Sequence, residues 1–250
     1  MVQPSFFSQE GIAEIRQLGG ATGAKLFDWL GHGYYAAKRF SPDHPYTLIS
    51  EWLCADIASF INLPIPTRQI IPHNGEKWLG FEWRDNGQTF MAGMENKLVN
   101  IEAVCGMLLL DVLICNRDRH AGNVVLQHPS PDMDGYVLNV IDHSHALIGD
   151  LPDFQTFVNY VHFNPDPDTF LRIAPPQLRS IVQGMDNFDL WIKKVENIAE
   201  SQIKNSATHI PIEWRPTPDD TNKLVDFLIE RKSKIRGLIG AGISNFPACK

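Results

Sequence analysis

The chain has 250 residues, a formal net charge of −7 at pH 7, 44% hydrophobic residues and 20% charged residues. This length allows one large domain or two lobes, and the composition is that of a globular protein with a sizeable core. The acidic balance argues against a protein that holds duplex nucleic acid through its overall field, and the lack of a run of about 18 apolar residues argues against a membrane-spanning helix.

The start of the chain and the cysteines bear on the cellular compartment. The first residues contain neither a basic region nor a long apolar stretch, so we expect no signal peptide. Cys54, Cys105, Cys115 and Cys249 show no CxxC spacing, which favours buried thiols over a disulfide framework or a zinc site. We therefore expect a cytoplasmic protein.

The first predicted element is a hairpin that follows a glycine-rich loop. The loop Gly19-Gly20-Ala21-Thr22-Gly23 precedes two apolar and aromatic runs, 25–30 and 34–40. Gly31-His32-Gly33 separates these runs, which predicts two antiparallel strands with Lys38 on the second.

A helix and a second hairpin follow. Apolar residues recur at nearly helical period over 47–61, and the Pro64-Ile65-Pro66 segment ends this helix. The segments 68–72 and 77–83 then predict two strands, because Asn74-Gly75 between them is a strong turn signal.

From residue 100 onward, helical patterns dominate. Asn100 is the predicted N-cap of a helix over 101–115, which is apolar almost all round and therefore buried. A polar loop, 116–122, breaks this helix. The short apolar runs 123–127 and 136–141 predict a third hairpin.

The rest of the chain predicts a surface loop and three closing helices. Residues 150–176 contain five prolines and predict an ordered loop; the helices are expected over 177–185, 190–203 and 219–239. These patterns predict an α+β, two-lobed fold of the protein-kinase type, with a strand-rich lobe over 1–97 and a mainly helical lobe over 98–250.

Three polar residues in the second lobe have the order that phosphoryl transfer needs. Asp118 lies in the polar loop, Asn123 follows five positions later, and Asp142 ends an apolar run 19 residues beyond Asn123. One carboxylate accepts the proton of the attacking hydroxyl, while a carboxamide and a second carboxylate hold Mg²⁺ on the phosphates of ATP. Each residue alone is typical of a turn or a strand end, but the set in this order favours a kinase.

The first lobe contains candidate contacts for the nucleotide. Backbone N–H groups of the loop around Gly20, Thr22 and Gly23 are suited to phosphates, and Lys38 provides a positive charge for them. Glu51 has apolar neighbours and needs a partner, for which Lys38 is the obvious candidate. The alternatives are a solvated lysine on an edge strand and a first-turn glutamate that favours the helix dipole.

The other charged residues of the loop have less specific readings. We expect His120 to be structural and to hydrogen-bond the backbone beside Asp142, rather than to act as a base. Arg117 and Arg119 are candidates for contacts with the phosphoacceptor region or with an acidic group of an activation loop.

The segment Asn116-Arg117-Asp118-Arg119-His120-Ala121-Gly122-Asn123, with Val140-Ile141-Asp142-His143 after it, resembles the catalytic signature shared by HipA-like kinases and phosphoinositide 3/4-kinases. The run from Leu48 to Pro66 is similar to the Glu-bearing helix of HipA-like proteins, and the whole chain resembles a compact HipA-like kinase domain.

This resemblance implies an ATP- and Mg²⁺-dependent kinase that phosphorylates Ser or Thr of a protein. It implies Asp118 as catalytic base, Asn123 and Asp142 as Mg²⁺ ligands, Lys38 as an ATP contact and Glu51 as its partner. An antitoxin-type partner is also expected, without nucleic acid as a direct ligand and without a membrane.

Two other functions stay open. A kinase fold could act on a small molecule or a lipid head group, although no basic amphipathic stretch for anionic membranes is present. A metal hydrolase could use His120 with the segment Asp142-His143-Ser144-His145, although residues of a strand alternate faces, so that this segment makes a poor cage. A non-catalytic nucleotide-binding module is a variant of the second alternative.

Overall fold

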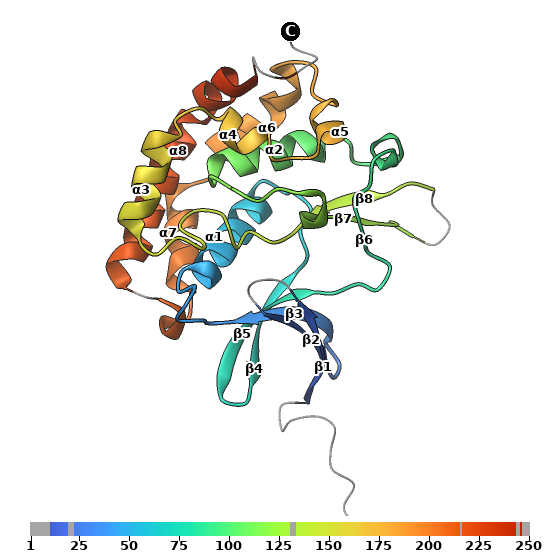
Figure 1. Cartoon of the computed structure of the whole chain (residues 1–250), viewed down its shortest axis with the longest axis vertical. Helices are drawn as coiled ribbons and strands as arrows, with labels where there is room; N and C mark the ends of the chain where they lie inside the picture. The colour runs from blue at the N-terminus through green and yellow to red at the C-terminus, as the bar shows by residue number, and fades with distance from the viewer. Residues whose placement is uncertain (1–10, 20–22, 131–133, 216, 244–245, 247–250) are drawn as a thin grey trace, which may run out of the picture.

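The computed structural model describes residues 11–19, 23–130, 134–215, 217–243 and 246. A five-stranded sheet from the first part of the chain lies at one end, and most of the helices lie at the other end together with three short strands (Figure 1). The predicted α+β, two-lobed fold is therefore confirmed. In the part of the chain that is described, no helix is both long and apolar enough to cross a membrane.

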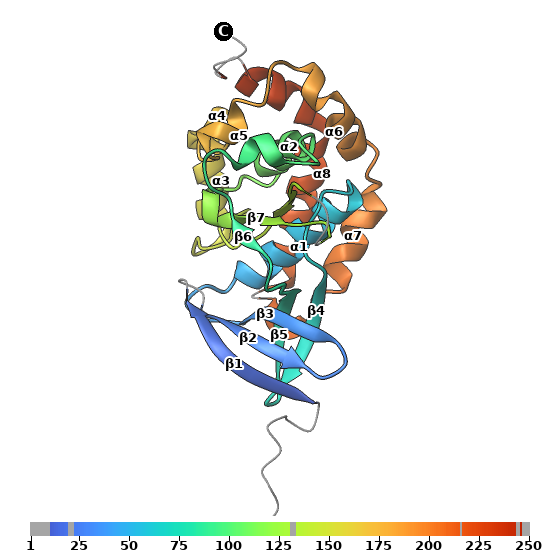
Figure 2. The ribbon, with the colours of Figure 1, turned by 90° about the vertical axis from the view of Figure 1, so that its right-hand side faces the viewer.

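The strand-rich lobe is a five-stranded antiparallel sheet in the order β1-β2-β3-β5-β4, which twists strongly in Figure 2. Its strands are β1 (Ile12–Gly19), β2 (Ala24–Trp29), β3 (Gly33–Arg39), β4 (Arg68–His73) and β5 (Glu76–Glu82). The β4–β5 turn has the conformation that its sequence predicts, because both Asn74 (φ 52°) and Gly75 (φ 76°) are left-handed, as a two-residue hairpin turn requires.

Strand β1 is an element that the sequence pattern did not predict. It pairs with β2, but the register shifts between Glu14 and Arg16 and again between Gln17 and Gly19. Such irregularities place an extra residue in one strand and break the alternation of apolar and polar positions by which strands are recognised.

The alternation along β3 directs Lys38 to the helical side of the sheet. Tyr35 and Ala37 are buried in a small cluster on one face, together with Phe27, Ile71 and Trp78. Since successive side chains of a strand point to opposite faces, Lys38 leaves the sheet on the other face.

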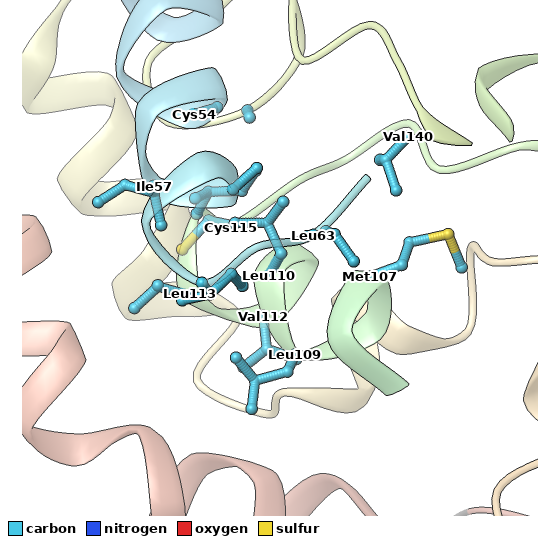
Figure 3. Close-up of a cluster of buried hydrophobic side chains, with 14 of the residues drawn as sticks. Cys54, Ile57, Leu63, Met107, Leu109, Leu110, Val112, Leu113, Cys115 and Val140 are labelled. Carbon is cyan, nitrogen blue, oxygen red and sulfur yellow. The ribbon is translucent and has the colours of Figure 1, made fainter. Parts of the chain in front are cut away.

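Helix α1 (Thr47–Phe60) lies across the junction of the two lobes (Figures 1 and 2). Its apolar residues, among them Cys54 and Ile57, belong to the main core, which they share with Leu109 and Leu110 of α2 (Ala103–Leu113) (Figure 3). The helix thus connects the sheet to the helical lobe through continuous packing.

The helical lobe contains a second sheet of three short antiparallel strands, in the order β6-β7-β8. The strands are β6 (Gln88–Thr89), β7 (Val124–Gln127) and β8 (Val137–Val140). The predicted third hairpin is β7–β8. The predicted N-cap role of Asn100 is wrong, because its side chain pairs with β8 instead. Leu138 N donates to Asn100 Oδ1 (2.8 Å), and Asn100 Nδ2 donates to Leu138 O (3.2 Å).

The remaining helices are α3 (Phe154–Phe163), α4 (Asp168–Leu171), α5 (Pro176–Arg179), α6 (Asp186–Glu196), α7 (Glu200–Thr208) and α8 (Pro218–Ile243), and the short 3₁₀ helices are η1 (Met94–Lys97), η2 (Ala121–Asn123) and η3 (Ile212–Trp214). Helices α6 and α8 pack against α2, and α7 packs against α1 and α8.

Three of the predictions for this region are wrong. Residues 150–176 are not a loop, since Asp153 caps α3 by accepting a bond from Thr156 N (2.6 Å) and the prolines flank the helices instead of interrupting them. The single helix expected over 190–203 is two helices, because Gln202 Oε1 accepts a bond from Ala199 N (2.8 Å) and begins α7 there. The helix expected over 177–185 is only the short α5, which ends at Arg179.

Candidate active site

Lys38 joins two acidic residues that are far apart in the sequence. Its Nζ atom lies 2.5 Å from Glu51 Oε1 in α1 and 2.9 Å from Asp142 Oδ1, which follows β8. Glu51 is 1% exposed, and its other oxygen accepts a bond from His143 N (3.1 Å). The predicted pair of Lys38 and Glu51 is present in this geometry, and Asp142 belongs to the same cluster.

The charges of this cluster do not balance, because one ammonium group faces two carboxylates. Burial alone would lower the pKa of Lys38, but Glu51 and Asp142 raise it above its usual value. Burial raises the pKa of Glu51, and Lys38 opposes this effect. Burial also raises the pKa of Asp142, but Lys38 and the hydrogen bonds from Ser144 lower it by more, so that the net shift is downward. The cluster therefore has surplus negative charge that a cation would neutralise.

The backbone at Asp142 is held in an uncommon conformation. Its φ is 54°, and Oδ1 accepts bonds from both Ser144 N (3.2 Å) and Ser144 Oγ (2.6 Å). Cys115 and Leu147, on either side of the site in the sequence, also have positive φ values. A positive φ costs energy for a residue other than glycine, and residues in this conformation tend to gather at functional sites.

Asp118 and Asn123 contact each other within the polar loop. Asn123 Nδ2 donates to Asp118 O (2.7 Å) and lies 3.4 Å from Asp118 Oδ2. Asn116 Oδ1 accepts a bond from Asp118 N (3.1 Å) at the start of the loop. Because the amide nitrogen of Asn123 is occupied in this way, its amide oxygen is the atom available to a metal ion.

A buried ion pair anchors this loop to the helix before it and to the segment after β8. Arg119 and Asp111 are both 0% exposed, and Arg119 Nε lies 3.0 Å from Asp111 Oδ2. Arg119 Nη1 donates to Asn123 O (2.7 Å) and to Ile141 O (2.8 Å), the residue before Asp142. Arg119 thus fixes the spacing between Asn123 and Asp142.

These contacts correct the predicted roles of Arg119 and His120 and give Arg117 an acidic partner in the segment after Asp142. Arg119 is buried and structural, so it cannot face a phosphoacceptor. It also makes the backbone contact beside Asp142 that was expected of His120, which instead accepts a bond from Gly122 N (3.0 Å) and is largely exposed. Arg117 donates to Leu147 O (2.6 Å) and pairs with Asp150 (2.8 Å).

The glycine-rich loop joins β1 to β2. Gly23 has a φ of 62°, a conformation that glycine adopts without strain. Gly20 and Thr22 lie outside the described residues, so their predicted phosphate contacts stay predictions, as does that of Gly23.

The metal-hydrolase alternative finds no support in the side-chain arrangement. Residues 142–145 follow β8 and are not in a strand, and the side chain of His143 is buried. Across the described ranges, no group of three or more His, Cys, Asp or Glu side chains is placed to hold a metal ion.

The sequence reading missed the residues that support the loop. Asp111 offered a signal, because it is the one carboxylate of the apolar α2 sequence and must have a partner when buried. His145 and Asp150 offered none, since their contacts with Asp118 and Arg117 depend on how the segment 142–150 folds back on the loop. Asn116 and Ser144 make local contacts, with Asp111 and Asp118 and with Asp142, that their residue types alone do not single out.

The sequence matches no family model and no curated protein. Two solved structures are similar in fold. The proinflammatory kinase CtkA of Helicobacter pylori is 16% identical with a TM-score of 0.62, over 93% of this chain and 95% of that chain. HipA from the toxin–antitoxin system of Shewanella oneidensis, solved with HipB and operator DNA, is 12% identical with a TM-score of 0.52, over 98% of this chain and 70% of that chain. The chain therefore has the fold of the HipA-like kinases.

Proposed function

We propose that this protein is an ATP- and Mg²⁺-dependent kinase that phosphorylates Ser or Thr of a protein substrate. The observation that carries the proposal is the convergence of Lys38, Glu51 and Asp142 from β3, α1 and the segment after β8. This arrangement suits a nucleotide site, because the lysine can pair with the negative phosphates and a carboxylate can hold the positive metal ion that accompanies them.

Each residue has a role that its position supports. Lys38 faces the phosphates of ATP, with Glu51 holding it in place. Asp142 and the amide oxygen of Asn123 offer the oxygen donors that Mg²⁺ prefers, and the surplus negative charge beside Lys38 suits a cation. When bound, Mg²⁺ would neutralise charge on the phosphates.

Asp118 accepts the proton of the attacking hydroxyl, since its side chain is partly exposed and Asn123 holds the residue in place. We expect backbone N–H groups of the loop around Gly20, Thr22 and Gly23 to bind the phosphates, as the sequence predicts.

The proposal also covers the two lobes, the cellular compartment and a partner protein. Residues 1–97 form the nucleotide-covering lobe and 98–250 the lobe with the catalytic loop, in a cytoplasmic protein. A partner protein of the antitoxin type fits the likeness to HipA, whose solved complex contains HipB. The net charge of −7 does not favour nucleic acid as a direct ligand of this chain.

Incubation with ATP labelled in its γ-phosphate, Mg²⁺ and a cell lysate tests the proposal. We expect label on Ser or Thr of a protein with the wild type and none above background with Asp118→Ala, which should bind ATP within a few fold of the wild type. Equal labelling by the two proteins would remove Asp118 from its role. No labelling by the wild type, or label only on small molecules, would contradict the proposed protein kinase.

A further inference from the structure

Asp118 Oδ2 lies between two histidines. His120 Nε2, from the same loop, is 3.6 Å away, and His145 Nε2, from the segment after Asp142, is 3.9 Å away. A carboxylate that accepts a proton during catalysis must also lose it, so the state of these two rings decides where that proton goes.

His120 presents a donor to Asp118. Its Nδ1 atom accepts a hydrogen bond from Gly122 N (3.0 Å). The neutral ring therefore has its proton on Nε2, the atom nearest Asp118. In this form His120 can donate to the carboxylate but cannot take a proton from it.

His145 presents the opposite atom. Its Nδ1 lies 3.2 Å from Asp150 Oδ2, while Asp150 Oδ1 accepts a bond from Arg117 Nη2 (2.8 Å). A carboxylate only accepts, so the neutral ring has its proton on Nδ1 and leaves the Nε2 lone pair toward Asp118.

Arg117, which pairs with Asp150 behind His145, is held by several contacts. Arg117 also donates to the carbonyl oxygens of Leu147 and Ile148, and its guanidinium lies over the ring of Tyr160. The charged groups near the ring of His145 are thus the carboxylates of Asp118 and Asp150 and the guanidinium of Arg117 that pairs with Asp150, while His120 contacts the same Asp118 oxygen.

We propose that His145 is a positioning residue that receives the catalytic proton from Asp118, while His120 donates to the same oxygen. This inference rests on the proposed function. The substrate hydroxyl gives its proton to Asp118 as its oxygen bonds to the γ-phosphorus, and the bond to the departing ADP oxygen breaks with its electron pair on ADP.

The proton then moves from Asp118 Oδ2 to His145 Nε2. The imidazolium that forms lies between two carboxylates, and its 31% exposure lets it return the proton to water. The 3.9 Å separation is of the kind that shortens when substrate binds.

The first test reads the tautomers by ¹⁵N NMR of the histidine-labelled full chain. We expect the Nδ1–H form for His145 and the Nε2–H form for His120 at a pH where both rings are neutral. Asp150→Asn should reverse the His145 tautomer, because Arg117 retains the amide oxygen and the amide nitrogen then donates to His145 Nδ1. The same tautomer for both rings in the wild type, or no reversal in D150N, would overturn the proposal.

The second test measures single-turnover phosphoryl transfer against pH. His145→Gln should slow transfer by about tenfold or more and remove the limb in which the rate rises as a histidine loses its proton. His120→Gln should keep that limb, and His162→Gln, an exposed histidine of α3, should match the wild type.

An unchanged pH profile in H145Q would overturn the role of His145 while leaving the proposed kinase intact. Absence of transfer by the wild type would overturn the proposed function and this inference with it. D150N should slow transfer as H145Q does, with an unchanged unfolding midpoint; a wild-type rate in D150N despite a reversed tautomer would also overturn the proposal.

Discussion

Two ion clusters lie within the site and differ in how their charges balance. Arg119 and Asp111 form a one-to-one pair with both side chains 0% exposed, and the remaining donors of Arg119 are taken by backbone carbonyls. Lys38 faces two carboxylates, one of which, Asp142, is 34% exposed. The first cluster is complete in itself, whereas the second has surplus negative charge and an open side.

This difference indicates that the Arg119–Asp111 pair supports the structure, whereas the Lys38 cluster can bind a ligand. A charge pair sealed from water can only hold segments together, and Arg119 does so for the loop that contains Asp118 and for the strand end before Asp142. An unbalanced cluster at a surface can exchange one of its contacts for a ligand. We therefore expect substitutions in the first cluster to affect stability and those in the second to affect activity.

The largest effect on folding is expected for Arg119→Met. It leaves Asp111 fully buried without its cation, which should lower the free energy of unfolding by about 3–5 kcal/mol in urea titrations. The double variant R119M/D111L should recover much of this loss, because it removes both charges. A change below about 1 kcal/mol would show that the pair is not the anchor of the loop.

Lys38→Met should mainly affect catalysis. The loss of a phosphate-directed charge from a water-poor site should slow phosphoryl transfer by about 10²–10³-fold. The variant also leaves Glu51 buried without its cation, so that some stability is lost as well. Lys77→Met is the matched control, since Lys77 is an exposed lysine of β5 that pairs with Glu213. Near wild-type transfer in K38M would erase the distinction between the clusters.

A smaller effect is expected for Ser144→Ala. The hydroxyl of Ser144 orients Asp142 through a 2.6 Å hydrogen bond, and the backbone bond to the same oxygen remains in the variant. We expect the Mg²⁺ concentration for half-maximal transfer to rise by roughly tenfold. Ser180→Ala, at the end of α5, should leave it unchanged. An unaltered Mg²⁺ dependence in S144A would argue that Asp142 needs no such orientation.

The same comparison explains what the sequence could predict. The hairpin at Asn74-Gly75 and the helix before Pro64 follow from local chemistry, and both are present. The pairing of Lys38 with Glu51 was predicted because a glutamate among apolar residues needs a cation. The burial of Arg119 was not, because nothing in the order Arg117-Asp118-Arg119 says which arginine turns inward.

Two further elements show why the rest was missed. β1 has register shifts that only its pairing with β2 accounts for. In 150–176, the prolines bound α3 and α4, and a sequence pattern does not distinguish prolines that flank a helix from prolines that prevent one.

The central claim is that the open cluster of Lys38, Glu51 and Asp142 is a nucleotide site. An experimental structure with Mg²⁺ and a non-hydrolysable ATP analogue tests it most directly. We predict Mg²⁺ on oxygens of Asp142 and Asn123, Lys38 on the phosphates with its contact to Glu51 kept, and the Arg119–Asp111 pair unchanged. Mg²⁺ more than about two coordination spheres from Asp142, or Lys38 directed to bulk solvent with the nucleotide bound, would contradict the claim.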